Sequence, residues 1–128
     1  MHALIVDDST LMRKVIERAL RQADIDFTLV TEASNGKEAL DRLRLAAAPD
    51  IILCDINMPG MDGIDFLEAR LAQNLAPGVP VVMISSKTNE QIVRRAIIAG
   101  ARGFLCKPFT SEQVKARLLP LLPASTGI

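Results

Sequence analysis

Five short apolar runs alternate along the chain with segments of helical periodicity, and this alternation is the feature that most restricts how the chain can fold. The runs cover residues 3–6, 27–30, 51–54, 79–84 and 103–106, and these lengths are typical of β-strands. They are apolar throughout rather than at every second residue, as expected of strands buried on both faces. The alternation predicts an α/β domain in which helices cover both faces of a five-stranded parallel sheet.

The segments between the runs carry apolar residues at intervals of three and four, the spacing of a helix with one buried face. We expect helices around residues 11–20, 39–43, 64–71 and 92–97, and a fifth over 111–119 that is ended by Pro120 and Pro123. The 128 residues are enough for one sizeable core. We therefore expect a single domain over residues 1–123, no effector domain, and a frayed tail at 124–128.

Charge and hydropathy exclude several classes of partner. Fifteen basic residues balance fifteen acidic ones, so no overall positive field gathers nucleic acid or anionic lipid. No apolar run approaches the ~20 residues of a membrane helix, and the N-terminus lacks the basic start of a signal peptide. We expect a cytoplasmic protein. Cys54 and Cys106 lie within apolar runs and are expected to be buried, reduced thiols.

Polar side chains follow four of the five predicted strands. Asp7 and Asp8 come after the first strand, Asp55 after the third, Ser85 after the fourth and Lys107 after the fifth. In an open parallel sheet, ligands bind in the crevice beyond the carboxyl ends of the strands. The sequence therefore predicts that these residues meet at one edge of the sheet.

A bound divalent cation is the chemistry that such a group of acids favours. Carboxylates held close together raise one another's pKa unless a cation lies among them. Oxygen ligands without histidine or thiolate favour Mg²⁺, which takes only one or two carboxylates and keeps several waters. The turn signals Pro59-Gly60 and Asp62-Gly63 bring backbone groups toward the same place. We therefore expect a Mg²⁺ site that stays open to a phosphate-bearing ligand.

Each residue also has a plain structural interpretation. Asp8 or Ser9 could cap the following helix, Ser85 could end its strand, and Lys107 could be a surface lysine. Capping explains one acid but not two in succession, and apolar neighbours on both sides of Lys107 favour a packed stem with a directed ammonium. Asp55, at the mouth of a strand beside a Mg²⁺ site and a lysine, is placed to attack phosphorus and form an aspartyl phosphate.

Four stretches, VDDS (6–9), CDINMPGMDG (54–63), VMISS (82–86) and GARGFLCKPF (100–109), resemble the receiver domains of two-component response regulators. They occur in order and span essentially the whole chain. The first stretch, extended through Arg13, is similar to the stand-alone chemotaxis regulators of that family. The resemblance implies a flavodoxin-like, doubly wound sheet in the order 2-1-3-4-5 with five helices.

The resemblance also implies roles for the residues at the sheet edge. Asp55 accepts the phosphoryl group from a histidine kinase. Asp8, Asp55 and the backbone carbonyl of Asn57 bind Mg²⁺, and Asp7 reaches the ion through water. Transfer of this kind is catalysed by the protein itself with Mg²⁺, so the resemblance implies a signalling phosphoacceptor with slow autodephosphorylation rather than an enzyme.

Lys107 and Ser85 are implied to contact the phosphoryl oxygens, with Ser85 moving toward them on phosphorylation. In the family this movement is coupled to an aromatic residue of the fifth strand, here Phe104 in place of the commoner Tyr. The output surface comprises the fourth helix, the fifth strand and the fifth helix, and includes Arg94 and Arg95.

The expected function is that of a monomeric, single-domain response regulator whose target belongs to chemotaxis, such as the flagellar motor switch. The alternative is a phosphorelay intermediate or phosphate sink that passes the phosphoryl group to a histidine phosphotransfer protein. A haloacid-dehalogenase hydrolase is disfavoured because the amide Asn57 stands where that enzyme needs a general acid. An FMN-binding flavodoxin is disfavoured because Asp7 and Asp8 would repel the FMN phosphate.

Overall fold

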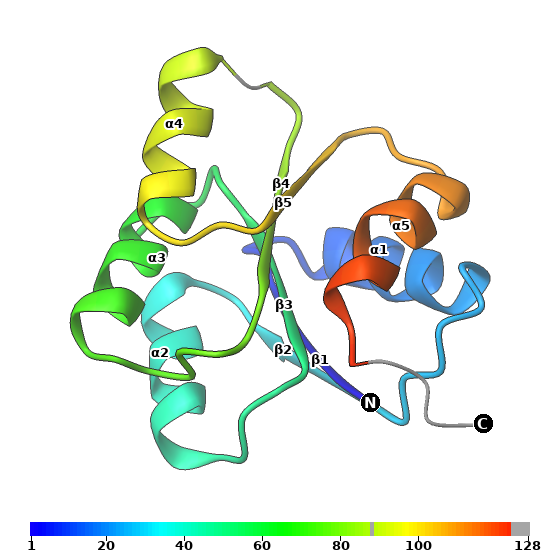
Figure 1. The fold of residues 1–128 in the computed structure, drawn as a ribbon, viewed down its shortest axis with the longest axis horizontal. Coiled ribbons are helices and arrows are strands. Elements are labelled where there is room, and N and C mark those ends of the chain that lie inside the picture. The colour runs from blue at the N-terminus through cyan, green and yellow to red at the C-terminus, as the bar shows by residue number, and fades with distance from the viewer. Residues whose placement is uncertain (88, 124–128) are drawn as a thin grey trace.

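The computed structural model describes residues 1–87 and 89–123 and confirms the expected alternation of strands and helices (Figure 1). Five parallel strands form one sheet in the order β2-β1-β3-β4-β5. This is the flavodoxin-like order that the resemblance implied. The tail predicted to fray, 124–128, lies outside the described residues. In chain order the elements are β1 (His2–Val6), α1 (Thr10–Gln22), β2 (Leu29–Ala33), α2 (Gly36–Leu45), β3 (Ile51–Asp55), α3 (Gly63–Ala72), β4 (Val81–Ser85), α4 (Glu90–Ile98), β5 (Gly103–Cys106), α5 (Ser111–Leu118) and the 3₁₀ turn η1 (Leu119–Leu121).

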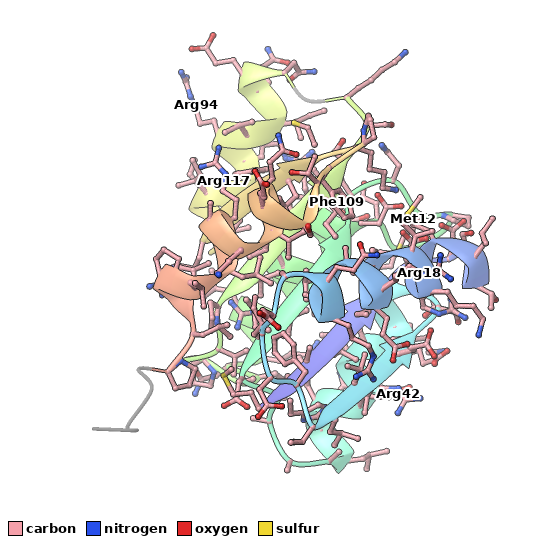
Figure 2. All side chains as sticks on the ribbon, turned by 90° about the vertical axis from the view of Figure 1, so that its right-hand side faces the viewer. Met12, Arg18, Arg42, Arg94, Phe109 and Arg117 are labelled. Atoms are coloured by element: carbon pink, nitrogen blue, oxygen red, sulfur yellow. The ribbon has the colours of Figure 1, made fainter. Side chains whose placement is uncertain are left out.

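Helices cover both faces of the sheet, with α2, α3 and α4 on one face and α1 and α5 on the other (Figure 1). The side chains of a strand point alternately to its two faces. In β3, Ile52 therefore belongs to the α2–α4 layer, whereas Ile51 and Leu53 belong to the α1–α5 layer. Figure 2 views the α1–α5 side, where Met12 and Phe109 pack against the edge of that layer.

Each of the five α-helices begins behind a polar residue that caps it. In each case the side chain accepts a hydrogen bond from the backbone N–H three residues later, and such a cap contributes about 1 kcal/mol. The caps are Ser9, Asn35, Asp62, Asn89 and Thr110. Within the described part of the chain, no helix has the length and apolar character needed to cross a membrane.

The second strand differs from the one predicted at residues 27–30. β2 begins at Leu29, ends at Ala33 and contains the polar residues Thr31 and Glu32. It pairs only with β1, and an edge strand of this kind tolerates polar side chains because one side of it meets solvent. Phe27, which began the predicted run, is buried in the α1–α5 layer just before the strand starts.

Three smaller expectations are also corrected. β4 starts at Val81 rather than at 79, directly after Pro80. The fifth helix ends at Leu118, and the chain continues through a 3₁₀ turn that includes Pro120, because proline fits the first positions of a helical turn. Cys106 is exposed at the end of the edge strand β5, and only Cys54 is a buried thiol.

Candidate functional site

The carboxyl ends of the strands bring the predicted residues together at one edge of the sheet. Because β1 pairs with β3 in the register Val6↔Cys54, the residues that follow, Asp7 and Asp55, lie side by side. Carboxylate oxygens of Asp7, Asp8 and Asp55 all lie within 4.8 Å of one another. The expected cluster of three acids is therefore present.

Lys107 lies between two of these acids. Its Nζ is 3.5 Å from Oδ1 of Asp55 and 3.7 Å from Oδ2 of Asp7, and its side chain is only 20% exposed. The backbone N–H of Lys107 donates to the carbonyl oxygen of Ser85 at 2.8 Å, which continues the pairing of β5 with β4. The lysine thus has the directed ammonium that its apolar neighbours predicted.

The acids are electrostatically strained without a further cation. Burial raises the pKa of both Asp7 and Asp55, and neighbouring carboxylates add to the rise. For Asp7 the opposing effects are the N–H of Ser9 and, more weakly, Lys107. For Asp55 they are Lys107 and the backbone N–H of Asn57. In both groups desolvation outweighs these partners, and the pKa stays above its ordinary value.

An orphaned oxygen tests whether a metal ion fits this place. Among the described residues, Oδ2 of Asp7 is buried and accepts no hydrogen bond, whereas Oδ1 accepts one from the N–H of Ser9 at 2.8 Å. Nζ of Lys107 lies 3.7 Å from this oxygen, beyond hydrogen-bond distance, so the buried oxygen still lacks a donor and a closer cation would stabilise it. Three carboxylates with hard oxygen donors match the ligand set of Mg²⁺. The residues present therefore fit a hard divalent cation.

Asp8 occupies the open side of the cluster. The cap of α1 is supplied by Ser9, whose Oγ accepts a hydrogen bond from the N–H of Met12 at 3.1 Å. The carboxylate of Asp8 is therefore not used in capping, and its side chain is exposed. Asp8 is therefore not the cap of the helix that follows, and its position favours a role as a metal ligand.

Helix α3 begins close to the acids because its first residue is a glycine. A Cβ at Gly63 would lie 2.3 Å from the carbonyl oxygen of Asp55, so no larger residue fits there. Gly63 donates its N–H to the carbonyl of Ile56 at 2.9 Å, which closes the loop around Asn57. Asn57 is exposed in this loop, and the binding of Mg²⁺ by its carbonyl stays a prediction.

Ser85 ends β4 beside Asp55, as expected from the register Asp55↔Ile84. Its hydroxyl is occupied, however. The Oγ donates to the carbonyl oxygen of Lys87 at 2.5 Å and accepts from the N–H of the same residue at 3.1 Å. The hydroxyl of Ser85 is therefore held by the loop that follows its own strand.

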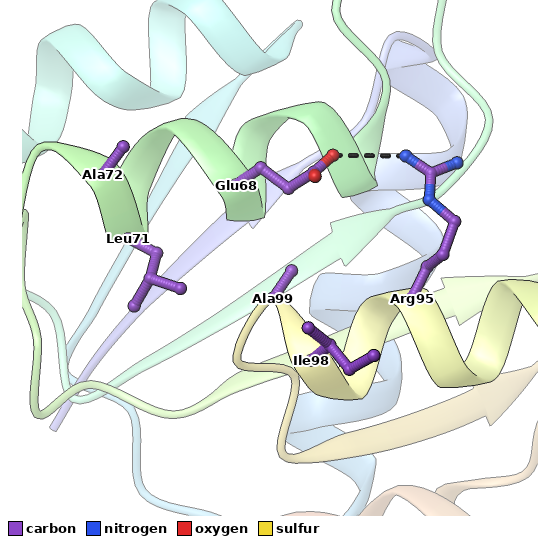
Figure 3. Close-up of a pocket in the computed structure, with 6 residues that line it drawn as sticks. All are labelled: Glu68, Leu71, Ala72, Arg95, Ile98 and Ala99. Atoms are coloured by element: carbon purple, nitrogen blue, oxygen red, sulfur yellow. Dashed lines mark hydrogen bonds and ion pairs between the residues drawn. The ribbon is translucent and has the colours of Figure 1, made fainter.

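The three residues assigned to the output surface lie in different environments. Phe104 is half-buried and packs against the α2–α4 layer. Arg94 is exposed and lies 3.9 Å from Glu90 of the same helix. Arg95 extends toward α3, where its Nη2 lies 3.2 Å from Oε1 of Glu68 beside a groove between the two helices (Figure 3).

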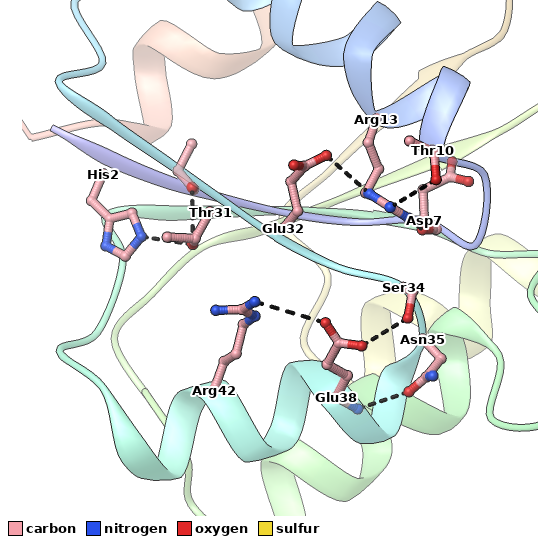
Figure 4. Close-up of polar contacts among 11 residues, drawn as sticks. His2, Asp7, Thr10, Arg13, Thr31, Glu32, Ser34, Asn35, Glu38 and Arg42 are labelled. Carbon is pink, nitrogen blue, oxygen red and sulfur yellow. Dashed lines mark hydrogen bonds and ion pairs between the residues drawn. The ribbon is translucent and has the colours of Figure 1, made fainter.

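The interpretation of the sequence missed one residue near the acids. Arg13 in α1 has a side chain that is only 13% exposed, and it donates to the backbone carbonyl of Asp7 at 2.6 Å (Figure 4). A basic residue in the first turn of a helix is a weak signal by itself. Its contact with the backbone of Asp7 depends on tertiary structure.

Comparisons with known proteins agree with this geometry. Residues 3–119 match the family model of the response regulator receiver domain. The chain is 38% identical over 127 residues to the chemotaxis protein CheY of Pseudomonas aeruginosa, which covers 99% of this chain and 100% of that protein. It is 41% identical over 116 residues to a protein-glutamate methylesterase/protein-glutamine glutaminase of Treponema pallidum, covering 89% of this chain and 28% of that longer protein. The solved structure of the chemotaxis response regulator CheY4 of Vibrio cholerae has a TM-score of 0.79 at 33% identity, covering 94% of this chain and 98% of that one.

Proposed function

The chain belongs to the response regulator receiver domain family, and from this membership we propose that Asp55 accepts a phosphoryl group from a histidine kinase. As a receiver domain, the chain is a signalling protein of two-component systems. One observation carries the assignment of Asp55: it is a nearly buried carboxylate that lies between an ammonium, 3.5 Å away, and two further acids. Asp7 is also close to Lys107, at 3.7 Å, but we assign Asp55 as the acceptor because it is the acid that ends the central strand β3.

Asp8 and Asp55 would hold Mg²⁺ together with the carbonyl of Asn57, and Asp7 would act through water. When bound, the ion neutralises charge on the phosphoryl oxygens. A carboxylate oxygen of Asp55 attacks phosphorus, the P–N bond of the kinase phosphohistidine breaks, and the imidazole leaves with the electron pair and takes a proton from solvent. The protein's own contribution is to hold the Asp55 carboxylate in line with the P–N bond and, through Lys107, to favour its ionised form.

Lys107 supplies a second positive charge beside Asp55, because its Nζ lies 3.5 Å from Oδ1 of that residue. It opposes the desolvation that raises the pKa of Asp55, and so favours the ionised form of that carboxyl. The same ammonium is close enough to contact an oxygen of a phosphoryl group on Asp55. A positive charge that is already in place stabilises the transition state without any movement of protein groups during the reaction.

Ser85 would link phosphorylation to the surface. To reach a phosphoryl oxygen, its hydroxyl must exchange its two bonds to Lys87, and this exchange releases the backbone of Lys87. A phosphoryl group adds about −1.5 to −2 charge. This charge interacts differently with the two conformations of the surface and so shifts the equilibrium between them. Phe104, Arg94 and Arg95 would belong to the responding surface formed by α4, β5 and α5.

For the output, we favour chemotaxis over a phosphorelay. The support is the likeness to a chemotaxis protein over nearly the full length of both chains. A flagellar motor switch protein is the target expected from this output.

The test is covalent labelling with acetyl phosphate and Mg²⁺, followed by intact-mass spectrometry. The wild type should gain one phosphoryl group that is lost in mild base, as an acyl phosphate is. Asp55→Asn should gain none, because an amide cannot form the anhydride. Asp26→Asn, an exposed acid in the α1–β2 loop, is the matched control and should label like the wild type. An unlabelled wild type, or a labelled Asp55→Asn, would contradict the proposal.

A further inference from the structure

Arg13 uses all three of its guanidinium nitrogens in different contacts (Figure 4). Nη1 donates to the backbone carbonyl oxygen of Asp7 at 2.6 Å, Nε to Oε1 of Glu32 at 3.0 Å, and Nη2 to Oγ1 of Thr10 at 3.2 Å. The partners come from the β1–α1 loop, the edge strand β2 and the start of α1. A planar guanidinium group that donates a hydrogen bond from each of its three nitrogens has little freedom to move.

The contact with Asp7 falls at the point where the acids begin. The N–H of Asp7 donates to the carbonyl of Ala33 at 3.1 Å and extends the pairing of β1 with β2. The carbonyl of Asp7, which starts the peptide unit leading to Asp8, is bound by Arg13. The orientation of this peptide unit sets the direction in which the Asp8 carboxylate leaves the chain. Arg13 is thus bonded to the backbone that joins two of the three acids.

Glu32 completes the arrangement from the neighbouring strand. Its side chain is 44% exposed, whereas that of Arg13 is 13% exposed. An ion pair with one half-exposed partner contributes little to stability by itself. It does fix the rotation of the guanidinium, and so aims Nη1 at the carbonyl of Asp7.

We propose that Arg13, oriented by Glu32, is a positioning residue for the Mg²⁺ site: it fixes the Asp7–Asp8 peptide unit and thereby the placement of the two carboxylates. This inference rests on the proposed metal site but adds residues that contact neither the ion nor the phosphoryl group. Groups that orient metal ligands in this way commonly change metal affinity by 10- to 100-fold when they are removed.

The sign of the effect separates this role from simple electrostatics. A guanidinium near the acids repels a second cation, so removal of its charge alone strengthens Mg²⁺ binding. Loss of positioning weakens it. A purely structural role would lower the stability of the fold and leave the dissociation constant of Mg²⁺ unchanged.

The experiment is Mg²⁺ titration by calorimetry and by NMR of wild type, Arg13→Met, Arg13→Lys and Arg21→Met. Arg21→Met is the matched control, because it removes from the same helix an Arg–Glu pair with the same 3.0 Å separation and no contact with the acids. Arg13→Met should raise the dissociation constant about tenfold or more. Arg13→Lys, whose ammonium can donate to the carbonyl of Asp7 but cannot reach all three partners, should raise it by a smaller factor. Arg21→Met should bind like the wild type.

The NMR spectra add a readout at the site itself. The amide proton of Ser9, which is bonded to Oδ1 of Asp7, should shift in Arg13→Met and stay in place in Arg21→Met. Glu32→Gln should weaken binding in the wild-type background and have little further effect in the Arg13→Met background, because it acts through Arg13.

Equal or tighter Mg²⁺ binding by Arg13→Met overturns the positioning role while the metal site stands. If Arg13→Met does not fold, the test rests on Arg13→Lys and Glu32→Gln. Wild-type Mg²⁺ affinity in both of these variants overturns the positioning role. A wild type that binds no Mg²⁺ removes the proposed metal site and this inference together. Because the titration contains no phosphoryl donor, failure of phosphorylation cannot be mistaken for any of these results.

Discussion

Nζ of Lys107 lies 3.5 Å from Oδ1 of Asp55, although their strands, β5 and β3, are not neighbours in the sheet. β4 lies between them and ends in Ser85. The lysine therefore reaches across the end of β4, and the acid, the ammonium and the hydroxyl come from three consecutive positions in the sheet. A phosphoryl group on Asp55 would meet residues from the ends of β4 and β5 at once.

Lys107→Ala should separate labelling from signalling. Mg²⁺ would still neutralise part of the developing charge, so labelling by acetyl phosphate should persist, slowed by up to about 100-fold. The amide shifts that phosphorylation produces in α4 and at Phe104 should be lost, because the ammonium no longer contacts the phosphoryl group. Mass spectrometry follows the labelling and NMR follows the shifts, with Lys107→Arg as the control that keeps the charge. Wild-type shifts in Lys107→Ala would contradict this role.

Asp8→Ala should weaken Mg²⁺ binding sharply, by about 100-fold, since it removes the carboxylate that we propose as a direct ligand on the exposed side of the cluster. The chain contains neither tryptophan nor tyrosine, so calorimetry or NMR is the suitable measurement. Asp26→Ala removes an exposed acid from the α1–β2 loop and should bind like the wild type. Equal affinities of wild type and Asp8→Ala would rule out Asp8 as a ligand.

Asp7→Asn should stabilise the metal-free protein at neutral pH. Burial raises the pKa of Asp7 in the folded state, so the folded protein binds this proton more tightly than the unfolded chain does. The ionised group therefore lowers the stability of the fold at neutral pH, and the penalty disappears as the pH falls through the raised pKa and then the ordinary carboxyl range. Denaturant unfolding without Mg²⁺ should show a gain in the free energy of unfolding near pH 7.

That gain should shrink as the pH falls toward 3. Saturating Mg²⁺ should reverse the order, because binding to the native state stabilises the wild type more than the variant. A gain that did not depend on pH would show that the charge of Asp7 is not its cause.

Gly63→Ala should destabilise the fold by roughly 2–4 kcal/mol, because its Cβ would meet the backbone carbonyl of Asp55 in β3, which cannot move aside as a flexible side chain can. The collision is with the carbonyl of Asp55, so Mg²⁺ affinity should fall as well. Gly78→Ala is the matched control: no atom lies within 4 Å of its added Cβ. Denaturant unfolding of both variants checks the stability. Similar midpoints for the two would contradict the close approach of α3 to β3.

Arg95→Glu should leave the labelling rate by acetyl phosphate unchanged and weaken binding to the flagellar motor switch protein that we propose as the target. The substitution places two acids opposite each other on α3 and α4, at a contact of 3.2 Å in the wild type. It should lower stability by at most about 1 kcal/mol, because the pair is exposed, and Glu68→Arg in the same chain should restore it. A changed labelling rate with intact partner binding would place Arg95 in the chemistry instead.

The fold could be predicted well because its signals are local. Apolar runs and helical periodicity established the order of strands and helices, and only the bounds moved by a few residues. The largest error, in β2, arose because an edge strand does not need the continuous apolar run that a central strand needs. The exposure of Cys106 has the same cause, since β5 lies at the other edge.

By itself, the sequence determined the α/β fold and the residues that gather at one sheet edge, because the carboxyl ends of parallel strands must meet there. Only the tertiary structure decided that Lys107 reaches Asp55 across β4, that Ser85 is bonded to its own loop, and that Arg13 holds the backbone of Asp7. Contacts of this kind depend on side-chain rotamers and on distances between elements far apart in the chain. The spacing of apolar residues within one segment determines neither these rotamers nor these distances.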